Sequence, residues 1–242
     1  MNLLLLEQND IVEPADGDVP GRAIIRGRRL KHVQDVHKAA VGDTLRMGVL
    51  EGEMGTATII RLEADVLELE YTLGIQPPEP LNITVLLAMP RPKMLKRTFQ
   101  TLAAMGVKRI VLMNTYRVEK SYWQTPWLKP EAIREQLILG LEQARDTVMP
   151  EVILEKRFKP FVEDRLPAMS EGMRKLVAHP ITDIECPRQV AEPVVLAIGP
   201  EGGFIPYEVE RLVEYGFECV HLGQRILRVE TAVPVLLSRL GC

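Results

Sequence analysis

Cysteine, long apolar runs and several common catalytic motifs are missing from this sequence of 242 residues. Its three cysteines, Cys186, Cys219 and Cys242, are odd in number and far apart, so neither a disulfide framework nor a paired-cysteine metal site is indicated. The four histidines form no set with metal-ligand spacing, and we expect no bound metal. The sequence also lacks a Gly-x-Ser-x-Gly elbow, a P-loop and a Gly-x-Gly-x-x-Gly repeat, so a serine hydrolase or a dinucleotide-binding enzyme has little support.

Long hydrophobic segments are equally scarce. The opening apolar run, Leu3–Leu6, is too short to span a bilayer, and it lacks the basic leader and cleavage site of a signal peptide. Hydrophobic residues nevertheless make up 46% of the chain and charged residues 26%, which excludes a disordered, collagen-like or coiled-coil protein. We therefore expect a soluble, cytoplasmic protein with no membrane partner.

Charge is distributed unevenly along the chain, although the formal net charge is only −3. Residues 1–74 hold 8 basic and 13 acidic side chains, a net of −5, whereas residues 91–134 hold 10 basic and 2 acidic side chains, a net of +8. A second basic stretch, residues 22–31, contains five cations and no acid. Local basic regions suit a phosphate-backbone ligand, while an ordinary solvated surface would account for the same counts.

Two sequence patterns divide the chain. In residues 1–74, short runs rich in Val, Ile, Leu and Thr alternate with turns such as Asp16-Gly17-Asp18, and one helical stretch lies near Leu30–Ala40, which predicts a small β-barrel. Residues 75–80 contain three prolines and are predicted to be a linker. In residues 81–242, uninterrupted apolar runs alternate with amphipathic helices, which predicts a mainly parallel sheet covered on both faces.

Two strand-to-loop junctions in the second region carry residues suited to chemistry. The apolar run Val194–Ile198 leads into Gly199-Pro200-Glu201-Gly202-Gly203, whose glycines permit positive φ and close approach of a ligand. The run Cys219–Leu222 leads into a loop containing Arg228, which precedes Glu230. Because ligands of parallel sheets bind beyond the carboxyl ends of the strands, these junctions are the predicted site. A structural turn and an Arg–Glu pair that holds a loop are the competing interpretations.

Together, these two segments resemble the RsmE family of methyltransferases. The similarity rests on Gly199-Pro200-Glu201-Gly202-Gly203 and on Leu222-Gly223-x-Arg225-Ile226-Leu227-Arg228-x-Glu230-Thr231-Ala232. Weaker similarities occur in the expected order at Leu45-Arg46-Met47-Gly48, Tyr116-Arg117-Val118 and Ala178-His179-Pro180. The resemblance spans nearly the whole chain.

The resemblance implies an α/β fold in which a small amino-terminal PUA-like β-barrel (residues 1–74) and a linker (75–80) precede a SPOUT-type α/β domain (81–242) with a carboxy-terminal trefoil knot. It implies a homodimer that transfers a methyl group from S-adenosylmethionine to N3 of a uridine in 16S ribosomal RNA of the small subunit. Family members hold the cofactor in the knot, largely through backbone groups. The matching cofactor positions are Ala178, His179, Ile198, Gly199, Pro200, Glu201, Gly203, Leu222, Gly223, Ile226 and Leu227.

Methylation of uracil N3 requires an exposed base, loss of the N3 proton and stabilisation of negative charge on O2 and O4. The resemblance implies that Arg228 stabilises this charge, that Glu230 orients Arg228, and that Glu201 provides a polar contact or accepts the proton. Basic side chains of both regions would position RNA phosphates. These are Arg22, Arg26, Arg28, Arg29, Lys31, Arg91, Lys93, Arg97 and Arg117.

The sequence departs from the family pattern at five positions: Thr101, Ala104, Asp146, Gln224 and Val229. These departures leave two related alternatives, a non-catalytic RNA-binding protein and a SPOUT methyltransferase that acts on a different RNA nucleotide. A third alternative, a small-molecule nucleotide-binding α/β enzyme without an RNA partner, is disfavoured by the basic segment at residues 91–134.

Overall fold

The computed structural model describes residues 2–17 and 19–241, and the chain forms two compact units. The N-terminal unit comprises residues up to 79 together with residues 138–149, and the C-terminal unit comprises residues 80–137 and those from 150 onward. Asp18 of the predicted first turn and Cys242 lie outside the described residues.

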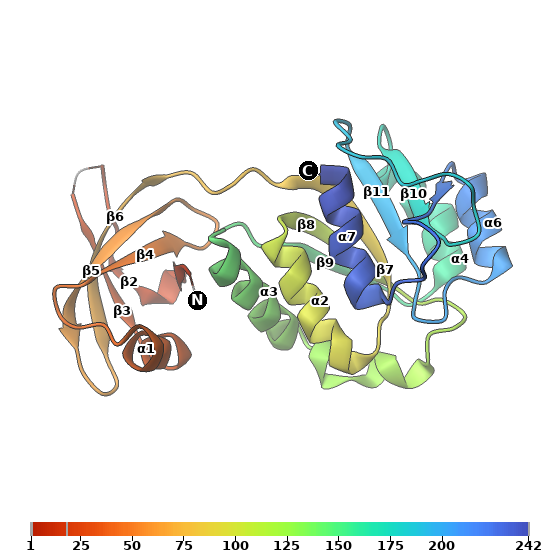
Figure 1. Cartoon of the computed structure of the whole chain (residues 1–242). Coiled ribbons are helices and arrows are strands. Elements are labelled where there is room, and N and C mark those ends of the chain that lie inside the picture. Colours follow the sequence, from red (N-terminus) through yellow and green to blue (C-terminus); the bar gives the residue numbers. More distant parts are fainter. Residues whose placement is uncertain (1, 18, 242) are drawn as a thin grey trace. The chain divides into compact units, whose positions relative to one another are not determined.

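The N-terminal unit contains one six-stranded sheet with the order β1-β4-β5-β6-β3-β2 (Figure 1). The β1–β4 pair is parallel and the other pairs are antiparallel. The elements are β1 (Leu4–Leu6), η1 (Gln8–Asp10), β2 (Ile11–Glu13), β3 (Gly21–Ile25), α1 (Arg28–His32), η2 (Val33–His37), β4 (Thr44–Val49), β5 (Met54–Leu62) and β6 (Leu67–Ile75).

Alternating side chains build the core of this unit. Along β3 and β6, buried residues alternate with more exposed ones, since successive side chains of a strand point to opposite faces. Ile25, Ile59, Leu69 and Tyr71 are almost completely buried in one cluster with Leu30 of α1. The predicted helix near Leu30–Ala40 is thus short: α1 continues into the π-helical turn η2, which ends before Lys38 in a left-handed conformation (φ 52°).

Residues 138–149 join the N-terminal unit through bonds that span most of the chain. The backbone carbonyl of Glu142 accepts hydrogen bonds from the backbone N–H groups of Asn2 (2.9 Å) and Leu3 (3.0 Å). The hydroxyl of Thr147 donates to the carbonyl of Gly52 (2.5 Å), 95 positions away. The sequence-based boundaries assigned these residues to the later domain, because contacts between positions so far apart leave no local signal.

The C-terminal unit contains a six-stranded, wholly parallel sheet with the order β12-β10-β11-β7-β8-β9. Its first elements are β7 (Leu81–Ala88), α2 (Pro92–Ala104), β8 (Val107–Met113), η3 (Lys120–Gln124), η4 (Pro126–Leu128), α3 (Pro130–Ala144) and β9 (Glu151–Glu155). Residues 138–144 of α3 belong to the N-terminal unit. Then follow α4 (Phe158–Pro160), η5 (Phe161–Arg165), α5 (Leu166–Met169), β10 (Arg174–Ala178), β11 (Val194–Ile198), α6 (Pro206–Glu214), β12 (Glu218–Val220) and α7 (Val229–Gly241).

Helices cover both faces of this parallel sheet. Figure 1 shows α2 and α7 over one face, where they pack on β8 and β7, and α4 and α6 on the other. The central strand β11 is completely buried, as expected for a strand covered on both sides. The protein therefore has a mixed α/β fold with two sheets, as predicted. None of the helices within residues 2–17 and 19–241 is long and apolar enough to cross a membrane.

Candidate functional site

The carboxyl ends of β10, β11 and β12 meet at one edge of the parallel sheet. The loops that follow these three strands line a pocket of about 290 Å³, which α7 closes with Val229, Ala232 and Leu236. We call it the glycine-loop pocket. Its wall consists mainly of apolar side chains and loop backbone, so it suits a ligand recognised by shape and by backbone hydrogen bonds.

The loop after β11 needs glycine because the backbone folds closely upon itself. A Cβ atom at Gly199 would lie 3.1 Å from the backbone nitrogen of Phe204 and 3.2 Å from its ring. Gly203 has φ +72°, which L side chains rarely adopt, and its N–H donates to the carbonyl of Pro200 (2.7 Å). The loop is therefore a tight turn that only small residues at these two positions can form.

The loop after β12 is held by a histidine side chain. Nδ1 of His221 accepts a hydrogen bond from the backbone N–H of Gly223 (2.9 Å), where φ is +117°. Beyond this turn the chain is open to solvent, and Ile226 is 83% exposed although it lines the pocket. The wall of the pocket on this side is therefore open to solvent.

The connection between β10 and β11 is fixed to both β12 and α7. The backbone of His221 exchanges hydrogen bonds with Ile184 (2.9 Å) and Cys186 (2.8 Å). Nε of Arg239, in α7, donates to the carbonyl of Cys186 (2.6 Å), and its guanidinium pairs with the carboxylate of Glu185. The hydrogen bond that the Arg239 guanidinium donates to the Glu185 carboxylate, together with the charge of Arg239, lowers the pKa of Glu185. The pocket wall is thus held by residues far apart in sequence.

A buried carboxylate joins the segment after β8 to the start of α6. Glu208 is only 2% exposed, and it accepts hydrogen bonds from the backbone N–H groups of Tyr116 (2.7 Å) and Ile205 (3.0 Å). The neighbouring Arg117 donates from its guanidinium to the carbonyl of Gly202. These bonds hold the backbone at Tyr116 and the side chain of Arg117 against the loop after β11, although Arg117 and Gly202 are 85 positions apart in sequence.

All eleven predicted cofactor positions line the glycine-loop pocket. They are Ala178, His179, Ile198, Gly199, Pro200, Glu201, Gly203, Leu222, Gly223, Ile226 and Leu227. Gly202 and Arg225, which belong to the two motifs, line it as well, and the prediction missed seven further lining residues: Pro180, Phe204, Val220, His221, Val229, Ala232 and Leu236. The last three recur at helical spacing along α7, a signal that is present in the sequence but is equally typical of core packing.

A family model described as an RNA methyltransferase domain matches residues 77–241, which include the whole glycine-loop pocket. The chain belongs to this RNA methyltransferase family. The resemblance to the RsmE family is confirmed.

Named relatives extend the similarity to the rest of the chain. The protein is 28% identical to ribosomal RNA small subunit methyltransferase E of Treponema pallidum, over 96% of this chain and 87% of the relative. It is 26% identical to ribosomal RNA small subunit methyltransferase E 1 of Borreliella burgdorferi, over 96% and 94% of the two chains. A crystal structure of ribosomal RNA small subunit methyltransferase E from Neisseria gonorrhoeae, bound to S-adenosylmethionine, shares the fold with a TM-score of 0.72, at 22% identity over 97% of this chain and 95% of that one.

The three predicted catalytic residues of this RNA methyltransferase family member do not gather at one point. Glu201 lines the glycine-loop pocket, and its carboxylate accepts a hydrogen bond from the backbone N–H of Arg91 (3.1 Å). Arg228 is exposed and lies outside the residues that line the pocket. Glu230 instead lines a separate hollow of about 230 Å³ with Arg97 and Thr101 of α2. Within the described residues, Arg228 and Glu230 form no ion pair, because the first turn of α7 directs Glu230 toward α2.

The predicted RNA-contacting cations fall into two groups. Arg22, Arg28 and Arg29 pair with Glu68 (2.6 Å), Glu142 (2.9 Å) and Asp10 (2.6 Å), so their charge is partly neutralised within the N-terminal unit. The remaining six are exposed and have no carboxylate partner in the part of the chain that the structure describes. They are Arg26, Lys31, Arg91, Lys93, Arg97 and Arg117.

No cluster of three or more metal-ligating side chains occurs among the described residues. The rings of His179 and His221 accept backbone hydrogen bonds from Ile181 (3.3 Å) and Gly223 (2.9 Å) instead. Both side chains therefore stabilise the loops of the pocket.

Proposed function

We propose that this protein is an S-adenosylmethionine-dependent methyltransferase that modifies N3 of a uridine in 16S ribosomal RNA. The observation that carries the proposal is the glycine-loop pocket at the edge of a parallel sheet, within the segment that matches an RNA methyltransferase family. Relatives named ribosomal RNA small subunit methyltransferase E support the small-subunit substrate.

The residues of the glycine-loop pocket fit S-adenosylmethionine. Ile198, Leu222 and Leu227 provide apolar walls for an adenine ring, and the tight turn at Gly199, where a Cβ atom would press on Phe204, sets the path of the loop backbone along the pocket. The absence of basic side chains from the β11 loop agrees with a ligand that carries a sulfonium cation. The bound cofactor supplies an electrophilic methyl group.

The chain's own residues would prepare the uracil. N3 is a poor nucleophile while it is protonated, so Glu201 is the candidate acceptor for its proton. Arg228 is the candidate that stabilises the negative charge on O2 and O4, since its side chain is exposed and its neighbours Leu227 and Val229 line the pocket. Glu230, at the start of α7, would act as a positioning residue for Arg97, with which it lines a hollow.

The same proposal includes the finer architecture. The N-terminal sheet would be a PUA-like barrel (residues 1–74) joined through residues 75–80 to a SPOUT domain (81–242) with a trefoil knot. The connection from β10 to β11 bonds to the ends of β12 and α7, which supports a chain crossing of the kind that a knot requires. We also propose that the protein is a cytoplasmic homodimer. Its RNA phosphates would be bound by the exposed cations Arg26, Lys31, Arg91, Lys93, Arg97 and Arg117. Arg22, Arg28 and Arg29, which are paired with carboxylates, would add further phosphate contacts.

Calorimetric titration with S-adenosylmethionine, followed by methylation of small subunits that lack the modification, tests the proposal. We expect saturable binding and a single new methyl group, which mass mapping places on N3 of one uridine. Cofactor binding without methyl transfer would favour a non-catalytic RNA-binding protein. A methyl group on another nucleotide would favour a SPOUT methyltransferase with a different RNA target. Absence of cofactor binding by the folded protein would overturn the proposal.

Substitution of Arg228 tests the assignment of the charge-stabilising group. Arg228→Ala should lower the methyl-transfer rate by about 10²–10³-fold while S-adenosylmethionine affinity stays unchanged, because the guanidinium acts only on the charged base. Arg188→Ala, which removes another exposed arginine of the same unit, is the matched control. Equal losses in both variants would contradict the assignment.

A further inference from the structure

A second pocket, in the N-terminal unit, lies outside the site described so far. Its volume is about 260 Å³. It is lined by residues of β1, η2 and β4 and by the end of α3, namely Asn2, Leu3, Leu4, Val33, His37, Thr44, Leu45, Arg46 and Arg145. We call it the arginine pocket.

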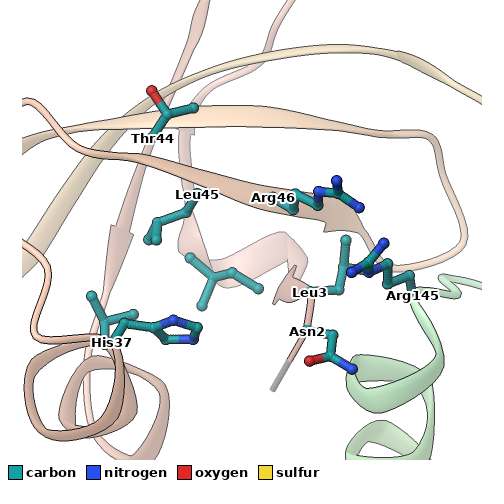
Figure 2. A pocket seen from close by; sticks show the side chains of 9 residues that line it. Asn2, Leu3, His37, Thr44, Leu45, Arg46 and Arg145 are labelled. Atoms are coloured by element: carbon teal, nitrogen blue, oxygen red, sulfur yellow. The ribbon is translucent and has the colours of Figure 1, made fainter.

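The arginine pocket combines an apolar floor with a cationic rim. Leu3, Leu4 and Val33 are buried, whereas Arg46 and Arg145 are exposed. Figure 2 shows the guanidinium groups of these two arginines on one side of the pocket and the imidazole of His37 on the other. Such an arrangement matches a ligand with an anionic group next to a less polar one.

The rim is basic although its surroundings are acidic. No Asp or Glu occurs among the residues that line the pocket. Four other arginines of this unit are paired with carboxylates, at Glu68, Asp10, Glu142 and Glu63. Arg46 and Arg145, by contrast, have no carboxylate partner within the described residues. An unneutralised arginine pair in a unit with excess acid indicates a site for an external anion.

The backbone of Arg145 is held in an unusual conformation. Arg145 follows the last residue of α3 with φ +59°, and the N–H of Asp146 donates to the carbonyl of Leu141 (3.1 Å), the bond that closes a helix of this type. Glycine is the usual residue at such a position because it adopts positive φ without strain. Arg145 adopts this conformation and points its side chain to the pocket. The carboxylate of the next residue, Asp146, accepts a hydrogen bond from the N–H of Val148 and does not line the pocket.

We propose that the arginine pocket binds one phosphate of the RNA substrate, with Arg46 and Arg145 on the phosphate oxygens and the ribose of the same nucleotide against Leu3 and Leu45. Planar guanidinium groups bind phosphate bidentately, and such contacts position RNA without reading its sequence. This inference rests on the proposed function, because RNA is the phosphate source that an RNA methyltransferase supplies.

Fluorescence anisotropy with a labelled single-stranded oligoribonucleotide tests the inference, on the full chain. Three variants are compared with wild type: Arg46→Gln, Arg145→Gly and the double substitution. Glycine is chosen at 145 because it suits the positive φ, so the fold is preserved. The double variant should bind about tenfold more weakly at low salt, and the slope of log affinity against log salt should fall by about 0.7, the value for one phosphate of a single strand.

Matched variants identify the cause of any loss. Arg61→Gln removes an exposed arginine of the same unit that is already paired with Glu63, and it should leave affinity and salt slope unchanged. Arg46→Lys keeps the charge and should retain most of the salt slope. An unchanged slope in the double variant, with an unchanged melting temperature, would overturn the inference.

Two further titrations separate this inference from a free-phosphate site and from a failure of the proposed function. Inorganic phosphate is titrated against the wild type and the double variant: if the substitutions remove phosphate binding but leave RNA affinity unchanged, the ligand is free phosphate and the RNA assignment is wrong. S-adenosylmethionine titration of the same variants should match wild type. If the wild type fails to bind the cofactor while the arginine variants still lose RNA affinity, the proposed methyltransferase function fails and the pocket assignment stands.

Discussion

The glycine-loop pocket and the arginine pocket have similar volumes, about 290 and 260 Å³, but different walls. The first is formed by loop backbone and apolar side chains, and its histidines bond to the protein's own N–H groups. The second is rimmed by guanidinium groups that have no carboxylate partner in the described chain. Added bulk should therefore damage the first pocket, and lost charge should damage the second.

The two units also use buried carboxylates differently. In the C-terminal unit, Glu208 bonds only to backbone N–H groups and so fixes the path of the chain. In the N-terminal unit, Glu142 bonds to the guanidinium of Arg28 and so fixes a side chain. This contrast predicts that substitution of Glu208 changes the glycine-loop pocket as well as stability, whereas substitution of Glu142 changes stability alone.

The largest effect on cofactor affinity is expected from a larger side chain at Gly199, in the loop after β11. Gly199→Val places side-chain atoms within about 3 Å of Phe204, and overpacking of this kind costs roughly 1–3 kcal/mol of folding stability. Because the loop must shift to relieve this contact, we expect affinity for S-adenosylmethionine to fall by about tenfold or more, which is about 1.4 kcal/mol of binding free energy. Calorimetry measures the loss. Gly52→Val, in the N-terminal unit, has its nearest contact at 3.4 Å and should leave the affinity unchanged. A similar loss of cofactor affinity in both variants would show that the glycine-loop pocket is not specifically sensitive to added bulk.

Glu208→Ala should have the next largest effect. It leaves two backbone N–H groups without their partner, and such losses cost about 1–3 kcal/mol each when the groups stay buried. We expect a loss of roughly 2–3 kcal/mol in the free energy of unfolding, measured by chemical denaturation, together with weaker cofactor binding. Glu210→Ala, an exposed carboxylate in the same helix, serves as the control. Normal cofactor affinity in Glu208→Ala would show that these bonds do not shape the pocket.

A smaller and purely structural effect is expected at Glu142. Its side chain is 2% exposed but its partner Arg28 is 43% exposed, so water can solvate the arginine when the carboxylate is removed. Glu142→Gln should therefore cost only about 1–2 kcal/mol of unfolding free energy. S-adenosylmethionine affinity should not change, and calorimetry on the same variant checks this. A marked loss of cofactor affinity would mean that the N-terminal unit influences the glycine-loop pocket.

The smallest effect compares two exposed ion pairs and depends on pH. Arg239 lowers the pKa of Glu185, and Arg61 lowers that of Glu63, through a hydrogen bond in each case. The ionised carboxylate is thus favoured by folding, so each contribution is present above the ordinary glutamate pKa of about 4.3 and is lost as pH falls through the lower folded value.

Only the first of these pairs joins distant parts of the chain, because Glu185 and Arg239 are 54 positions apart whereas Arg61 and Glu63 are 2 apart. Glu185→Gln should weaken cofactor binding a few-fold at pH 7, and the difference in melting temperature from wild type should shrink as the pH falls toward 4. Glu63→Gln should leave cofactor binding unchanged. Equal cofactor affinity in the two variants would show that the β10–β11 connection does not depend on its ion pair.

Much of the candidate site could be predicted from the sequence because its residues lie in two short motifs. Gly199–Gly203 follows the buried strand β11 and Leu222–Leu227 follows β12, and parallel strands bring their carboxyl ends to one edge. The motifs could not reveal that α7 closes the pocket, since Val229, Ala232 and Leu236 have the spacing of ordinary core residues. They also could not reveal that Glu230 would lie beside Thr101 and Arg97, which depends on how α7 packs against α2.

The sequence by itself determined most of the elements: periodicity separates strands from helices, and glycine marks turns such as that at Gly203, although Lys38 and Arg145 also adopt positive φ. Only the tertiary structure decided which charges are free. Arg28 and Arg46 look equivalent in a count of basic residues, yet one is paired with Glu142 and the other is exposed at the rim of a pocket with Arg145. The reason is physical: ion pairs and pockets join residues about a hundred positions apart, and local sequence carries no record of such contacts.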